Sequence, residues 1–130
     1  MDELTRTMAA SASGMRAQSA RVRLSSENIA NADTPGYRRK LVSFEQAFAE
    51  PGEPVTVKAG PMQLDQSELL QVYDPTNPLA DKNGYYQGSN VDLMVEIADA
   101  REANRSYEAN LRLFDQARQM ASSLLGLLRR

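Results

Sequence analysis

Three carboxylates, Asp92, Glu96 and Asp99, follow one another at spacings of four and three residues and are the first candidates for chemistry in this chain. This spacing places all three on one face of a helix, where they could bind a hard cation. A solvated helix N-terminus explains them more simply, because the helix dipole favours negative side chains there. We therefore expect no metal site.

A basic triplet, Arg38-Arg39-Lys40, follows Tyr37. Such a triplet could contact an anionic lipid surface or a nucleic acid, but three basic residues are too few to predict either partner. The favoured interpretation is a surface patch that contacts an acidic neighbour.

The composition removes most other kinds of site. The chain has 130 residues and contains no histidine, no cysteine and no tryptophan. It therefore has no Ser-His-Asp or Cys-His set and no disulfide, and it has no glycine-rich phosphate loop. The net charge of −2 gives no reason to expect nucleic-acid binding. We predict no catalytic residue, no cofactor and no small-molecule substrate, and a small enzyme that uses Asp or Glu as acid and base is the least favoured alternative.

The C-terminal third carries a regular apolar stripe from Leu93 to Leu128. Its steps alternate between three and four residues, which is the spacing of a coiled-coil seam. A helix of about 36 residues would be roughly 54 Å long and would need a partner helix. The predicted stripe consists of Leu93, Ile97, Ala100, Asn104, Tyr107, Leu111, Phe114, Arg118, Ala121, Leu125 and Leu128.

The N-terminal segment offers that partner. Met8, Met15, Val22 and Ile29 recur every seven residues, and small residues between them would let another backbone come close. We predict a helix over residues 3 to about 31. Its apolar stripe is narrow, so packing against a neighbour must supply much of its stability.

Two interpretations of these helices stay open. They could form an ordinary hairpin within one monomeric domain, or they could be interfaces that other subunits complete. The polar stripe residues Asn104 and Arg118 would fix the register of the helix pairing and the choice of partner helix. Alternatively, the heptad phase is wrong and both residues face solvent. The predicted subunit-interface residues are Met8, Met15, Val22, Ile29, Ile97, Asn104, Tyr107, Leu111, Phe114 and Leu125.

The middle of the chain reads as a small, partly β insertion. Pro35 and Gly36 end the first helix, and Asn83-Gly84 predicts a tight turn before an extended segment. Residues 55–58 and 69–73 read as strands, whereas residues 41–49 are ambiguous between strand and helix. Asn90 or Asp92 would cap the last helix.

The predicted fold class is mainly α with a small β part, in which the N- and C-terminal helices pair as a coiled coil. Its segments are residues 1–36, 37–90 and 91–130. Residues 1–40 carry a net charge of +3 and residues 41–90 carry −5, while the last forty residues are balanced. These charges could attract subunits head to tail, or they could be merely solvated surfaces.

Residues 28–38 read Asn-Ile-Ala-Asn-Ala-Asp-Thr-Pro-Gly-Tyr-Arg. This string resembles the signature of the bacterial flagellar axial proteins, the rod and hook family. Residues 106–111, Ser-Tyr-Glu-Ala-Asn-Leu, resemble the second shared element, and the short length resembles proximal-rod members. Residues 87–89 depart from the pattern, since relatives often carry a proline before the following asparagine. The motif-turn residues carried by the resemblance are Asn28, Asn31, Thr34, Pro35, Gly36 and Tyr37.

The resemblance implies a structural protein of the proximal rod that stacks helically and transmits torque. Segments 1–36 and 91–130 would form the inner axial layer, and the β part would lie outside. Implied partners are copies of itself, other rod subunits, the rod's basal adaptor protein and, in transit, the flagellar type III export apparatus. The implied location is the periplasmic rod, reached without a cleaved signal peptide. The alternative is a cytoplasmic coiled-coil adaptor or export chaperone.

Overall fold

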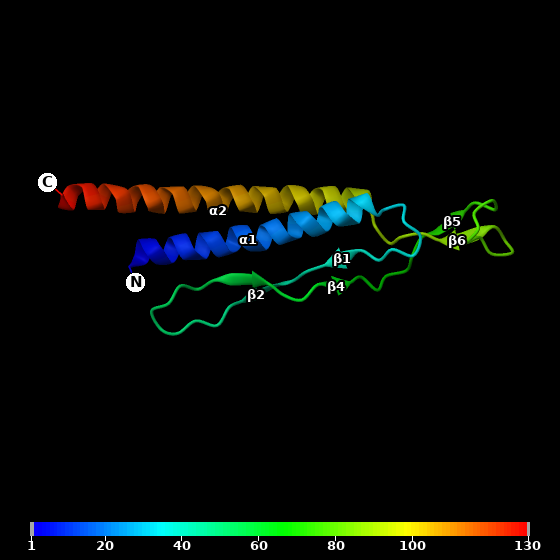
Figure 1. The fold of residues 1–130 in the computed structure, drawn as a ribbon, viewed down its shortest axis with the longest axis horizontal. Helices are drawn as coiled ribbons and strands as arrows, with labels where there is room; N and C mark the ends of the chain where they lie inside the picture. The colour runs from blue at the N-terminus through cyan, green and yellow to red at the C-terminus, as the bar shows by residue number, and fades with distance from the viewer. Residues whose placement is uncertain (1, 130) are drawn as a thin grey trace.

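The computed structural model describes residues 2–129, and two long helices dominate it. Helix α1 spans Glu3–Ala30 and helix α2 spans Leu93–Leu128, so both predicted helices are confirmed almost to the residue. The helices lie antiparallel and side by side within the one chain, with both termini at the same end (Figure 1). Met1 and Arg130, the outermost residues of the predicted terminal segments, lie outside the described residues.

Both helices begin at an aspartate whose side chain caps the first turn. Asp2 accepts a hydrogen bond from the backbone N–H of Thr5 at 2.7 Å, and Asp92 accepts one from Met94 at 3.0 Å. Each bond satisfies one of the N–H groups that a helix start leaves free. Of the two predicted caps for α2, Asp92 is therefore the one used.

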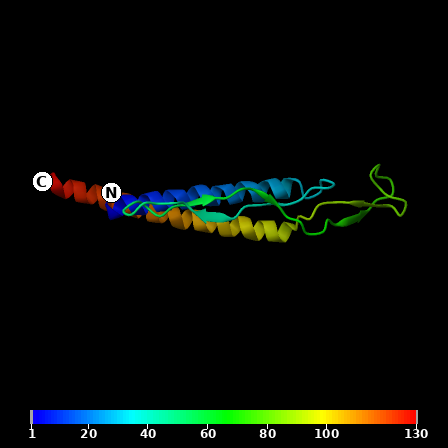
Figure 2. The ribbon, with the colours of Figure 1, turned by 90° about the horizontal axis from the view of Figure 1, so that it is seen from below.

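A long irregular hairpin follows α1 and lies lengthwise along it (Figures 1 and 2). Its outgoing arm holds β1 (Lys40–Leu41) and β2 (Phe44–Gln46), and its returning arm holds β3 (Val57–Ala59) and β4 (Gln63–Leu64). The pairs β1–β4 and β2–β3 are antiparallel. The ambiguous stretch 41–49 is thus extended in part. The strand predicted at residues 55–58 lies at residues 57–59, on the hairpin's returning arm.

A second hairpin projects beyond the helix ends at the opposite extreme from the termini (Figure 1). Strand β5 (Gln71–Tyr73) pairs with β6 (Tyr85–Gln87), and Gly84 reverses the chain at a φ of 88°. A positive φ costs glycine little, which is why the turn forms there. The predicted turn and the extended segment after it are both confirmed.

The two helices meet through a heptad pattern of small and polar residues. Glu96, Ala103 and Ala117 are buried. Asn110 lies against Gly14 of α1, so closely that a Cβ added to Gly14 would lie 2.8 Å from the side-chain amide of Asn110. Buried and half-buried positions of α2 recur at steps of four and three residues. They are Glu96, Asp99 and Ala100, Ala103, Ser106, Asn110, Phe114 and Asp115, Ala117 and Ala121.

Three of the eleven members of the predicted stripe, Ala100, Phe114 and Ala121, lie on this contact face, and five others are displaced from it by one residue. The displaced members are exposed, and the residue that precedes each of them lies on the contact face instead. The prediction selected apolar side chains, whereas the close approach of the helices needs small ones. Asn104 and Arg118 therefore face solvent, as the alternative interpretation held. The displaced members are Ile97, Asn104, Tyr107, Leu111 and Arg118, and the remaining three, Leu93, Leu125 and Leu128, are exposed near the helix ends.

On α1, the predicted stripe lies beside the helix contact. Met8, Met15 and Val22 are half-buried, and Ile29 is exposed. The fully buried face of α1 is instead mostly small and polar. It consists of Ser11, Ser13, Ala17, Leu24, Ser25 and Asn28.

Helix α2 has 36 residues and α1 has 28, and the C-terminal end of α2 extends past the start of α1 (Figure 1). Much of its apolar surface is exposed, including Leu111, Leu113, Met120 and Leu125. Neither helix in residues 2–129 is both long and apolar enough to cross a membrane. The apolar core of the described chain is correspondingly thin.

Candidate functional site

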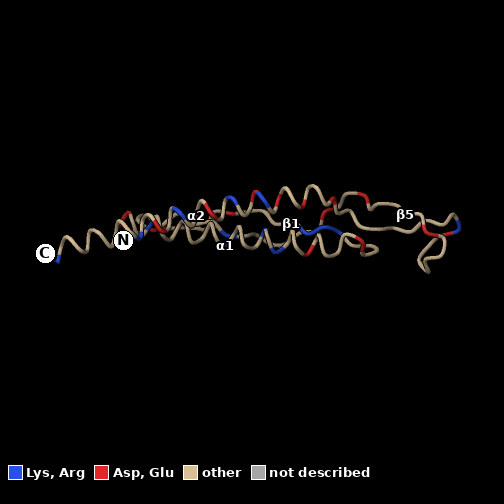
Figure 3. Tube along the Cα trace, turned by 90° about the horizontal axis from the view of Figure 1, so that it is seen from above, with Lys and Arg blue, Asp and Glu red and all other residues tan. Residues whose placement is uncertain are grey.

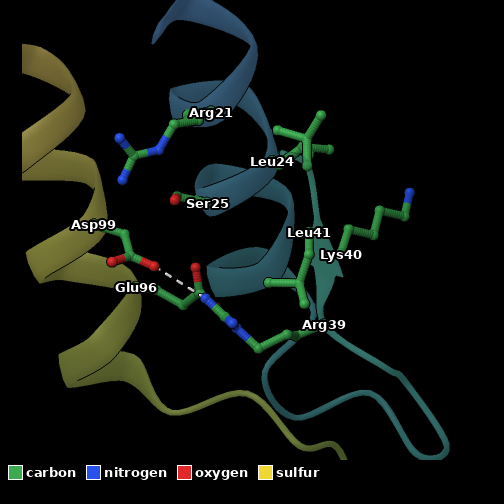
Figure 4. Close-up of a pocket in the computed structure, with 9 residues that line it drawn as sticks. Arg21, Leu24, Ser25, Arg39, Lys40, Leu41, Glu96 and Asp99 are labelled. Atoms are coloured by element: carbon green, nitrogen blue, oxygen red, sulfur yellow. Dashed lines mark hydrogen bonds and ion pairs between the residues drawn. The ribbon is translucent and has the colours of Figure 1, made fainter. Parts of the chain in front are cut away.

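The residues of the motif turn meet the start of α2 at a junction of buried polar groups. We call this junction the clasp and define it by Asn28, Tyr37, Arg39, Lys40 and Glu96. The clasp joins the last turn of α1, the first residues of the long hairpin and the first turns of α2 (Figure 4).

Asn28 lies at the centre of the clasp and is almost completely buried. Its Nδ2 donates to the backbone oxygen of Lys40 at 3.0 Å and to Oε1 of Glu96 at 3.2 Å. Its Oδ1 accepts from the Tyr37 hydroxyl at 2.7 Å and from the Lys40 N–H at 2.9 Å. One amide side chain therefore fixes three segments of the chain, and its whole hydrogen-bonding capacity is used.

Arg39 reaches across the clasp to three carboxylates. Its Nε donates to Oε1 of the fully buried Glu96, its Nη2 lies 3.0 Å from Asp99, and its Nη1 lies 3.7 Å from Asp65. Burial alone would lower the pKa of Arg39, but the hydrogen bond to Glu96 and the three negative charges outweigh it and raise that pKa. Arg39 therefore stays charged.

These pairings correct two sequence predictions. Glu96 and Asp99 are not solvated helix-start acids or cation ligands, because an arginine from the hairpin binds both. Asp92 caps α2, and Glu96 lies in its first turn but is buried and bound by Arg39. Among residues 2–129 no group of three or more acidic side chains is arranged to hold a metal ion.

The basic triplet does contact acidic groups, but they belong to the same chain. Lys40 Nζ lies 3.0 Å from Glu27, and this hydrogen bond together with the negative charge raises the pKa of Lys40. Arg38 donates to the backbone oxygens of Asp65 and Ser67. In Figure 3 the basic segment at β1 runs beside acidic positions. The triplet is therefore structural within the subunit.

Asn90 is a clasp-supporting residue that the sequence prediction considered only as a helix cap. Its Oδ1 accepts from the Arg39 N–H at 2.6 Å, and its Nδ2 donates to the backbone oxygen of Asp65 at 2.9 Å. Asp65 is itself held by Ser67, whose N–H and hydroxyl lower the pKa of the carboxyl, with a further contribution from Arg39. The signal available in the sequence was the Asn-Val-Asp string at residues 90–92.

The rest of the motif turn shapes the exit from α1. The Thr34 hydroxyl donates to Oδ1 of Asn31 at 3.1 Å, while Pro35 is exposed. Gly36 adopts a φ of 74°, and its N–H donates to the backbone oxygens of Gln87 and Gly88. Burial raises the pKa of Tyr37, whose hydroxyl donates to Asn28. The six predicted motif-turn residues therefore lie together in space, at one end of the helix pair.

The clasp is built to hold chain segments together. The donors and acceptors of Asn28, Tyr37 and Lys40 are satisfied by one another, and Arg39 is surrounded by its carboxylates. A catalytic group needs a free reacting atom within reach of a substrate, whereas these atoms are already engaged.

Comparison with known proteins places the fold in a class. A family model described as flagella basal body rod protein matches residues 8–38, which hold most of α1 and the motif turn. A second model, described as flagellar basal body rod FlgEFG protein C-terminal, matches residues 82–127 and so covers β6, most of the clasp's α2 side and nearly all of α2. The class defined by the paired helices and the clasp is that of flagellar basal-body rod proteins.

Curated relatives identify the member of that class. The chain is 43% identical to the flagellar basal-body rod protein FlgC of Agrobacterium fabrum, over 99% of this chain and 98% of the relative. It is 38% identical to FlgC of Salmonella typhimurium and 34% identical to FlgC of Bacillus subtilis, over 88% of this chain in each case and 90% and 91% of the relatives. The chain belongs to the FlgC family of flagellar basal-body rod proteins.

The chain is therefore a structural subunit of the flagellar basal-body rod that assembles with other rod components. The sequence resemblance to the rod and hook family is confirmed at the level of this family. The alternative function as a cytoplasmic adaptor or export chaperone is set aside by the same relatives.

Proposed function

We propose that this rod subunit stacks helically in the proximal rod by burying the exposed apolar side chains of both helices against neighbouring subunits. The observation that carries the proposal is the distribution of burial on α2. Ala103 and Ala117 on the contact face are 0% and 3% exposed, whereas Ile97, Leu111 and Leu125 are 41%, 41% and 57% exposed. Burying a leucine fully is worth about 1.5–3 kcal/mol, so these side chains favour assembly.

The residues displaced from the helix contact are thus the ones available to other subunits. On α1 the corresponding surface carries Met8, Met15, Val22 and Ile29, half-buried or exposed beside α2. Tyr107 is 38% exposed and Phe114 is half-buried on the contact face, and both would also contact a neighbouring subunit. Asn104 is exposed between Ile97 and Leu111 and would fix the register of a neighbour.

The clasp would fix the angle between the helix pair and the rest of the subunit. In the proposed rod, segments 1–36 and 91–130 form the inner axial layer, and residues 37–90 lie outside. Buried, hydrogen-bonded groups resist deformation, so the clasp would carry torque from the helices to the outer part. We infer that the subunit has no catalytic role, because its relatives are structural rod proteins and the polar groups of Asn28, Tyr37, Lys40 and Arg39 are engaged in holding chain segments together.

The proposed neighbours are copies of this chain, other rod subunits and the rod's basal adaptor protein. The proposed location is the periplasmic part of the basal body, reached through the flagellar type III export apparatus without signal cleavage. The antiparallel helix pair has few buried apolar residues, which suits a chain that must pass through a narrow channel unfolded.

The test is Leu111→Asp, expressed in a flagellated bacterium that lacks its own copy of this gene. Leu111 is exposed and lies outside the helix contact, so the isolated subunit should fold and be exported. A carboxylate in an apolar subunit contact is strongly unfavourable, so we expect loss of motility. Gln116→Asp, on the solvent face of the same helix, is the matched control and should leave swimming normal.

Wild-type swimming by the Leu111→Asp strain would contradict the interface assignment. Fractionation of the same strains tests the location separately. Wild-type and Gln116→Asp subunits should co-purify with basal bodies, whereas exported Leu111→Asp protein should be found in the periplasm or medium. A wild-type subunit found only in the cytosol would overturn the proposed export.

A further inference from the structure

The clasp contains a small cavity next to a buried carboxylate oxygen. The cavity has a volume of about 60 Å³ and lies between α1, α2 and the start of the long hairpin (Figure 4). Its polar lining comes from Glu96 and Asp99 on α2, from Ser25 and Arg21 on α1 and from Arg39 and Lys40 of the hairpin, and its apolar lining includes Leu24.

Glu96 presents an unsatisfied atom beside this space. The residue is 0% exposed, and Oε1 accepts hydrogen bonds from Asn28 and Arg39. Its other oxygen, Oε2, is buried and accepts from no donor in residues 2–129. A charged oxygen removed from water without a replacement donor is strongly unfavourable, so a donor is expected beside Oε2.

The cavity has the size and the chemistry to supply that donor as solvent. A water molecule needs about 10–15 Å³ of such space and two to four polar partners, and its share of liquid volume is about 30 Å³. The 60 Å³ cavity therefore has room for about one or two molecules. Figure 4 shows the Ser25 hydroxyl directed toward α2, on the same side as the Glu96 carboxylate.

We propose that this cavity binds ordered water, which donates a hydrogen bond to Oε2 of Glu96 and contacts the Ser25 hydroxyl. The bound water completes the hydrogen bonding of a carboxylate that already holds Asn28 and Arg39. It thereby becomes a structural part of the link between α1 and α2.

Water ¹⁷O relaxation dispersion on the folded, full-length chain tests this proposal. We expect a dispersion whose amplitude corresponds to about one or two water molecules with long residence times. Ser25→Val, which replaces the hydroxyl with a methyl group and fills part of the cavity, should remove most of that amplitude. Ser26→Val is the matched control, because Ser26 is exposed on the neighbouring position of the same helix.

Circular dichroism establishes that each variant keeps wild-type helix content. If Ser25→Val loses helix content, Ser25→Thr is used in its place. Threonine adds one methyl group and keeps the hydroxyl, so we expect a smaller loss of dispersion amplitude. A folded wild type without the dispersion, or an amplitude unchanged by the Ser25 variant, would overturn the proposal. Enhanced ²³Na relaxation in the wild type that disappears in Ser25→Val would also overturn the proposal, because the occupant would then be a sodium ion.

Discussion

Asn28 in the last turn of α1 donates a hydrogen bond to Glu96 in the first turn of α2 across 3.2 Å, although 68 residues separate them in the chain. Both side chains are buried, and Arg39 binds the same carboxylate oxygen. The bond ties the C-terminal end of α1, where the motif turn begins, to the N-terminal end of α2. It also joins the two segments that the family models match separately, residues 8–38 and 82–127.

Replacing Asn28 with alanine should destabilise the subunit strongly. The change removes four hydrogen bonds, leaves the half-buried Tyr37 hydroxyl and Lys40 backbone groups without these partners, and leaves Oε1 of Glu96 with Arg39 alone. At about 1 kcal/mol for each bond, we expect a loss of about 3–4 kcal/mol in the free energy of unfolding. Urea denaturation followed by circular dichroism measures it. Asn104→Ala, at an exposed position of α2, should change stability by less than about 0.5 kcal/mol.

Gly14 should tolerate no side chain while Asn110 faces it. A Cβ at Gly14 would lie 2.8 Å from the Asn110 amide, so Gly14→Ala must push the helices apart or displace that side chain. We expect a destabilisation of about 1–2 kcal/mol despite alanine's better helix propensity. Thermal unfolding is the measurement.

Two further variants isolate the cause of that effect. Adding Asn110→Ala to Gly14→Ala makes room for the new methyl group and should recover the lost stability. Gly126→Ala has nothing within 4 Å of the added Cβ, so it should be neutral or slightly stabilising. A double variant no more stable than Gly14→Ala would rule out the proposed contact.

The stability of the clasp should fall at alkaline pH. Burial raises the pKa of Tyr37 above its ordinary 10.0, and the hydrogen bond to Glu27 raises that of Lys40 above 10.5. A raised pKa means that the folded state holds the proton more tightly, so both contributions are complete below about pH 10 and are lost as pH rises through the folded values. The urea midpoint should therefore be steady near neutral pH and decline above about pH 10.

Tyr37→Phe provides the control for the alkaline transition. Phenylalanine cannot donate to Asn28, so the variant should be less stable near neutral pH and should lose less stability on raising the pH. A variant with the full wild-type decline would show that Tyr37 does not contribute to it.

Amide hydrogen exchange in the isolated subunit should be uneven along α2. The first turns are held by the clasp, whereas the end of the helix extends past α1 and exposes Leu124, Leu125, Leu127 and Leu128. Opening free energies follow local packing, so amides after about residue 118 should exchange much faster than those of residues 96–110. Uniform protection along α2, measured by NMR, would show that the helix end is stable without a neighbour.

The helix bounds could be predicted because the sequence marks them clearly. Proline and glycine after residue 34 end α1, and a capping aspartate precedes an uninterrupted run of helix-forming residues in α2. The short strands were only partly predictable, because two- and three-residue strands depend on pairing across the hairpin rather than on a local pattern.

The contact face of α2 could not be found by a search for apolar periodicity. Ile97 and Leu111 are more hydrophobic than the Glu96 and Asn110 that precede them. Asn110 nevertheless lies on the contact face because α1 approaches closely at Gly14, and Glu96 lies there because Asn28 and Arg39 donate to it. A seven-residue repeat of Glu96, Ala103, Asn110 and Ala117 was present in the sequence, but it reads as a small polar stripe. Likewise, the acidic partners of Arg39 are distant in the chain, so no local pattern predicted them.

The long hairpin has a mechanical consequence that follows from its direction. Its strands run lengthwise beside α1, and the hydrogen bonds of an antiparallel pair lie perpendicular to the strands. Because the tip joins β2 and β3 covalently and both arms run along the long axis, a pull along that axis would load the two strands in the same direction and leave the hydrogen bonds between them unstrained. Pulling one arm of the hairpin away from the other sideways would break these hydrogen bonds one after another. The subunit should therefore resist a force along its length better than a force across its width.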